Sequence, residues 1–171
     1  YNLTFKGNEI AGISAYTSRY AMYCIYVNGV SEISNNNIHG EVTSGWLYGI
    51  YLSNSGGTNA NRAKIHNNMI QVGATTTSAG TLYGMYLTNA GYFNIYHNSV
   101  LANSGGASSR ALYATGGGGV ELVNNIFANY TAGYALYVAN AFSISNSNNN
   151  VLYSPSGNIG YFNGNTLTLA N

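Results

Sequence analysis

Seven side chains of this 171-residue chain could take part in acid–base or metal chemistry. Inverting glycoside hydrolysis needs two carboxyl groups about 6.5–9.5 Å apart, and a metal site needs several convergent ligands. The chain has no aspartate, so every carboxylate must come from glutamate. Whether these residues do chemistry therefore depends on which of them the fold brings together. They are Glu9, Glu32, Glu41, Glu121, His39, His66 and His97.

One phrase, an apolar residue followed by x-Asn-Asn-x and a second apolar residue, recurs along the chain. It reads ISNNNI at residues 33–38 and IHNNMI at residues 65–70, and its second Asn recurs in steps of 24 to 32 residues. A period in this range indicates a repeat architecture. Asparagine tolerates the left-handed backbone of a tight corner, and identical Asn side chains in successive coils can hydrogen-bond as a ladder. The predicted ladder is Asn8, Asn36, Asn68, Asn98, Asn125 and Asn149.

A second phrase reads LYGIYL at residues 47–52 and LYGMYL at residues 82–87. Residues two apart share one face of a strand, so Ile50 and Leu52 should point inward and Tyr51 outward. One column of the alignment holds only small residues and predicts a crowded bend; it consists of Cys24, Gly49, Gly84, Ala111 and Ala135. The outward column, one tyrosine per coil, is Tyr26, Tyr51, Tyr86, Tyr113 and Tyr137. A second column contains Tyr48, Tyr83 and Tyr134, with Arg110 in place of a fourth tyrosine.

Each period thus contains two or three short strands and no helical pattern. Phrases such as YGIYLSNSGG and KIHNNMI resemble the generic repeat of the right-handed parallel β-helix (pectate-lyase-like) superfamily, from about Phe5 to Val151. The resemblance implies an all-β, right-handed parallel β-helix, a single-stranded solenoid of about six coils of 24–32 residues. We expect residues 1–171 to form a single β-helix domain that is a segment of a longer protein.

The superfamily that the chain resembles includes polysaccharide lyases and inverting polygalacturonases, so an enzyme has to be considered. In the alignment Glu32 and Glu121 share one column but lie three coils, roughly 14 Å, apart, which is too far for a hydrolytic pair. Glu32 and Lys64 should be outward neighbours that support the register. No carboxylate-rich calcium cluster is visible, and the histidines fall in different columns. The sequence therefore predicts no catalytic residues, no metal and no cofactor.

Composition narrows the remaining classes of partner. Only 5% of the residues are charged and the net charge is +1, compared with about 25% charged residues in ordinary domains. With no basic patch, nucleic-acid binding is not expected, and the apolar stretches are too short for membrane insertion. Cys24 is the single cysteine, so an intrachain disulfide is impossible. The polar, weakly charged composition favours an extracellular or cell-surface location.

The outward tyrosines allow two interpretations. Stacked aromatic rings stabilise a sheet by themselves, and an exposed aromatic stripe also marks an interaction surface. Our first hypothesis is a non-catalytic module that binds a polysaccharide, a cell-surface glycan or another surface through the tyrosines. The alternative is a structural or assembly segment of an adhesin, stalk or filament that self-associates through its coil ends. A polysaccharide lyase or glycosidase ranks third.

Overall fold

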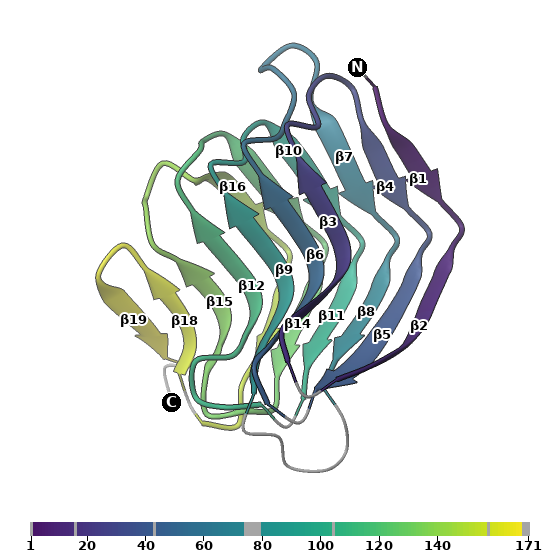
Figure 1. Cartoon of the computed structure of the whole chain (residues 1–171). Coiled ribbons are helices and arrows are strands. Elements are labelled where there is room, and N and C mark those ends of the chain that lie inside the picture. Colours follow the sequence, from purple (N-terminus) through teal and green to yellow (C-terminus); the bar gives the residue numbers. More distant parts are fainter. Residues whose placement is uncertain are drawn as a thin grey trace.

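The computed structural model describes residues 2–15, 17–42, 44–73, 80–103, 105–156 and 158–168. In them the chain forms nineteen β-strands and no helix, and therefore no helix of the length and hydropathy needed to cross a membrane. The strands wind into a parallel β-solenoid of about five turns, with three sheets along its length (Figure 1). The predicted all-β parallel β-helix is confirmed.

Sheet A is made by the first strand of each turn, and all its pairings are parallel. Glu32 and Lys64 lie in register on adjacent strands, as predicted, and Asn94 and Glu121 continue the same column. Its strands are β1 (Thr4–Lys6), β4 (Glu32–Ser34), β7 (Ala63–His66), β10 (Phe93–Tyr96), β13 (Val120–Val123) and β16 (Ile144–Asn148).

Sheet B follows sheet A after a corner of two residues, such as Asn35 and Asn36 between β4 and the next strand. Asn35 has a φ of 54°, which asparagine tolerates better than most residues. The strands of sheet B are β2 (Glu9–Ala15), β5 (Asn37–Val42), β8 (Met69–Val72), β11 (Ser99–Ala102), β14 (Ile126–Asn129) and β17 (Val151–Tyr153).

Sheet C closes each turn and has the longest strands. It ends in an antiparallel pairing of its last two strands, which departs from the parallel pattern of the rest. Its strands are β3 (Arg19–Ile25), β6 (Trp46–Ser53), β9 (Thr81–Thr88), β12 (Arg110–Thr115), β15 (Tyr134–Val138), β18 (Asn158–Phe162) and β19 (Asn165–Thr168).

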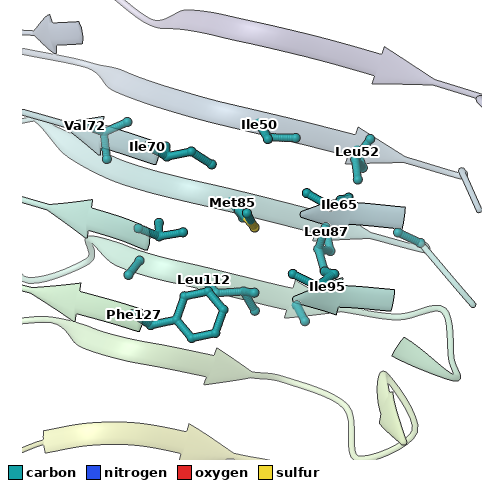
Figure 2. Packing of buried hydrophobic residues seen from close by; sticks show 14 of the residues in the cluster. Ile50, Leu52, Ile65, Ile70, Val72, Met85, Leu87, Ile95, Leu112 and Phe127 are labelled. Atoms are coloured by element: carbon teal, nitrogen blue, oxygen red, sulfur yellow. The ribbon is translucent and has the colours of Figure 1, made fainter. Parts of the chain in front are cut away.

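The core is a continuous apolar column inside the three sheets. Ile65 and Ile95 from sheet A, Phe127 from sheet B and Leu112 from sheet C are all completely buried (Figure 2). The register places like residues above one another, so each coil packs only on its neighbours, as in other solenoids. This stacking fixes the spacing of every outward column.

The predicted crowded bend is present in sheet C. Gly49 and Ile50 are consecutive and both buried, so the alternation of inward and outward residues along the strand is interrupted there. A Cβ at Gly49 would lie 2.6 Å from the backbone oxygen of Gly84. Cys24 does not belong to this column, because it lies in register with Leu52; Ala21 occupies the position opposite Gly49.

The asparagine ladder lies inside the corner between sheets A and B. Asn36, Asn68, Asn98 and Asn125 are 1–2% exposed, and Nδ2 of each donates to Oδ1 of the asparagine in the next coil at 2.9–3.0 Å. Asn8 begins the ladder with an Nδ2–Oδ1 distance of 3.1 Å to Asn36.

The last rung differs from the prediction. Nδ2 of Asn125 donates to Asn150, not to Asn149. Asn149 is exposed and has a φ of 53°, so it occupies the left-handed corner position one residue earlier. That position is filled in other coils by Asn35, Asn67 and His97.

Candidate functional site

Three of the glutamates form separate pairs with basic side chains, each at a different place on the solenoid. Nε2 of His39 lies 3.3 Å from Glu9, Nε2 of His66 lies 3.2 Å from Glu32, and Arg62 lies 3.5 Å from Glu121. In the described strands no glutamate is the register partner of another glutamate. Across the described residues, no three His, Cys or Glu side chains gather as they would around a metal ion. The two histidine–glutamate pairs connect neighbouring coils, and Arg62 reaches Glu121 two coils away.

Among these paired glutamates, Glu32 interacts with two side chains. Its Oε1 accepts a hydrogen bond of 2.6 Å from Ser34 Oγ and lies beside His66. The Ser34 hydrogen bond lowers the pKa of Glu32, and the charges of His66 and Lys6 act in the same direction. Ser34 itself is completely buried and donates to the carboxylate, so its hydroxyl is not placed as a nucleophile for an external substrate. The cluster is built to hold coils in register.

The outer surface of sheet C carries two parallel rows of tyrosines, which we call the tyrosine face. The rows are formed because tyrosines three residues apart on each strand meet their counterparts on the next strand. The outer row is Tyr23, Tyr51, Tyr86, Tyr113, Tyr137 and Tyr161. The inner row is Tyr20, Tyr48, Tyr83, Arg110 and Tyr134.

The structure corrects the first member of the predicted tyrosine column. Tyr23, not Tyr26, lies in register with Tyr51, and the two rings stack at 5.0 Å. Tyr26 follows β3 with a φ of 55° and is 70% exposed. The other four predicted members, Tyr51, Tyr86, Tyr113 and Tyr137, are together in the outer row.

The rings of the outer row lie face to face. Successive centroids are 4.3–5.1 Å apart, with interplanar angles of 9–27°. Rings of the inner row contact rings of the outer row edge-on. Tyr83 and Tyr86, for example, have a centroid distance of 4.9 Å and an interplanar angle of 90°. A ring face covered by its neighbours cannot also stack on a sugar ring. The interior of the tyrosine face therefore offers ring edges and hydroxyl groups.

No tyrosine hydroxyl of this face is buried without a partner. In the described part of the chain, the two buried side-chain polar atoms that lack one are His66 Nδ1 and Arg110 Nε. Tyr51, Tyr86, Tyr113 and Tyr137 are half-buried, so part of each side chain contacts solvent. The face thus presents donors and acceptors at a repeat set by the strand spacing of about 4.8 Å.

Burial makes the tyrosine face sensitive to alkaline pH. It raises the pKa of Tyr86 to about 12, and it also raises the pKa of Tyr48, with neighbouring tyrosines adding to both effects. In the unfolded chain these phenols ionise near pH 10. A raised folded-state pKa gives stability that is complete below about pH 10 and is lost as pH rises toward the folded pKa.

We therefore expect the melting temperature to stay level up to about pH 9 and to fall between about pH 10 and 12. Thermal denaturation followed by circular dichroism at each pH, with phenolate absorbance as a parallel readout, measures this. The Tyr86→Phe variant should show a shallower fall. An identical pH profile for Tyr86→Phe would contradict the assignment.

The fold and its outer face together define a class: a parallel β-solenoid with an internal asparagine ladder and a tyrosine stack along one sheet. Comparison of the chain with protein family models, with curated proteins and with solved structures finds no match. The function must therefore be argued from the tyrosine face itself.

Proposed function

We propose that this chain is a non-catalytic, extracellular β-solenoid module that binds glycan through the tyrosine face. The observation that carries the proposal is the double row of tyrosines on sheet C, whose stacked rings are half-buried and remain partly exposed. Tyrosine provides both apolar area and a hydroxyl at low entropic cost. Because its rings are already stacked, little conformational freedom is lost when a ligand binds.

The mode of contact differs from ring-on-ring stacking. A polysaccharide that follows the solenoid axis would meet the same edge and hydroxyl on every coil. Each contact is weak, but several identical contacts in a row add up when the ligand repeats as well. The sugar hydroxyls would exchange hydrogen bonds with Tyr51, Tyr86 and Tyr113, and sugar C–H groups would pack on the ring edges.

We further infer that the chain is a member of the right-handed parallel β-helix (pectate-lyase-like) superfamily. The three parallel sheets, the two-residue Asn corner and the internal ladder support this inference. Each glutamate pair described above joins side chains from different coils, which supports a binding role over a hydrolytic one.

The expected result is saturable binding of the purified chain to at least one polysaccharide in a panel of insoluble and soluble polymers. Replacing both Tyr51 and Tyr86 by alanine should weaken that binding at least about tenfold, because two contacts of roughly 1 kcal/mol each are lost. Depletion from solution and affinity electrophoresis measure it.

Two further variants sharpen the test. Tyr51→Phe/Tyr86→Phe keeps the stack and removes only hydroxyls, so it should lose an intermediate amount. Tyr26→Ala removes an exposed tyrosine outside both rows and should bind as wild type does. Unchanged binding by a folded double-alanine variant would refute the proposal. No binding by the wild type would favour the structural or assembly segment, and release of soluble sugar would indicate an enzyme.

A further inference from the structure

The charges of this protein are divided between its sheets. All four glutamates lie on strands of sheets A and B, whereas the strands of sheet C contain two arginines and no acidic residue. The two arginines differ in setting. Arg19 is exposed and donates to Thr17 and Ser18, while Arg110 lies within the inner row of the tyrosine face.

Arg110 is held in place by aromatic rings and by backbone oxygens. Its guanidinium carbon lies 4.8 Å from the ring centroids of both Tyr134 and Tyr137, the distance of a cation–π contact. Nη1 donates to the carbonyl oxygens of Ala107 at 2.8 Å and Ser109 at 2.7 Å. The side chain is therefore oriented before any ligand arrives.

Space for the guanidinium depends on Gly133. A Cβ at that position would lie 2.7 Å from Nη1 of Arg110 and 2.0 Å from the backbone oxygen of Ser109. This position of the inner row thus accommodates an arginine, whereas the two preceding coils have Tyr48 and Tyr83 at the same position.

Among the residues that the structure describes, no carboxylate forms an ion pair with Arg110. The ion pairs among the described residues involve Arg62, His39 and His66 instead. Nε of Arg110 is buried without a partner, and Nη2 donates to no protein atom in the described part of the chain. Burial also lowers the pKa of Arg110. A partly buried cation without a counter-ion is costly unless a ligand supplies the opposite charge.

We propose that Arg110 is an oxyanion-recognition point of the tyrosine face, which binds a carboxylate or sulfate group of the ligand through its free Nη2 edge. This inference rests on the proposed glycan-binding function and adds the charge of the ligand to it. A guanidinium recognises both groups by charge-assisted hydrogen bonds. The flanking tyrosine rings limit the access of water and strengthen that contact. A glycan with acidic groups is therefore preferred to its neutral counterpart.

The test compares three polymers that share one backbone: dextran, carboxymethyl dextran and dextran sulfate, each cast into gels for affinity electrophoresis. The variants are Arg110→Gln, Arg110→Lys and Lys64→Gln. Lys64 is an exposed residue of sheet A, so its replacement removes the same unit of charge on a different face. Melting temperatures establish that each variant is folded.

We expect the wild type and Lys64→Gln to prefer the anionic polymers about tenfold, a preference worth one charge-assisted contact. Arg110→Gln should lose the preference. Arg110→Lys should keep part of the preference. If Arg110→Gln does not fold, the reduced preference of Arg110→Lys serves as the test. The two anionic gels show whether carboxylate or sulfate is favoured.

Three outcomes would overturn the inference. Equal retardation by all three polymers would remove the charge preference and leave the glycan-binding proposal intact. An equal loss in Lys64→Gln would assign the preference to net charge and not to Arg110. No retardation by any polymer would count against both proposals.

Discussion

Replacing Asn98 by alanine is expected to lower the free energy of unfolding by about 3–5 kcal/mol. The side-chain oxygen of Asn98 accepts from both the backbone nitrogen and Nδ2 of Asn68, at 3.1 and 2.9 Å, and its own Nδ2 donates to the backbone oxygen of Ile65 at 2.9 Å. Asn98 is 1% exposed, so alanine leaves these buried groups without partners. Each unsatisfied buried polar group costs about 1–3 kcal/mol.

Urea denaturation followed by circular dichroism measures this loss. The matched control is Asn37→Ala, since Asn37 adjoins the ladder in sequence, is exposed and has no side-chain hydrogen bond among the described residues. It should change stability by less than about 0.5 kcal/mol. A loss below about 1 kcal/mol in Asn98→Ala would show that the ladder adds little stability.

Phe127→Ala is expected to be about as damaging, with a loss of about 3–5 kcal/mol. Phe127 is completely buried in sheet B (Figure 2). It lies in register with Val100 in the preceding coil and with the half-buried Leu152 in the following coil. Its removal leaves a cavity that the parallel strands on either side cannot close, because their spacing is fixed by hydrogen bonds to both neighbours.

Phe142→Ala is the control for that experiment. Phe142 is 80% exposed, so its replacement should be nearly neutral in the same urea titration. Similar losses for the two variants would contradict the burial assigned to Phe127.

The repeat made much of the fold predictable. In the asparagine ladder, the prediction was right except at the last rung. The pattern of two apolar residues around Asn-Asn placed Asn36, Asn68, Asn98 and Asn125 correctly. In the last coil Asn148, Asn149 and Asn150 are consecutive, so the pattern could not say which of them turns inward. The left-handed φ of Asn149 and the hydrogen bond from Asn125 to Asn150 settle it.

The predicted tyrosine column was wrong at its N-terminal end for a related reason. Tyr20, Tyr23 and Tyr26 are spaced by three, so either consecutive pair matches Tyr48 and Tyr51. Packing decides, because Met22 lies in register with Ile50 and points into the core. The covered ring faces and the orientation of the Arg110 guanidinium depend on side-chain torsions, which an alternating pattern does not specify.

The asparagine ladder also has a direction. In every rung Nδ2 donates toward the C-terminal coil and Oδ1 accepts from the N-terminal one. The amide dipoles therefore align head to tail, as peptide units do in an α-helix. Their partial charges leave a negative end at Asn8 and a positive end at Asn150. A chain with a net charge of only +1 thus carries an internal electric axis that its surface residues do not reveal.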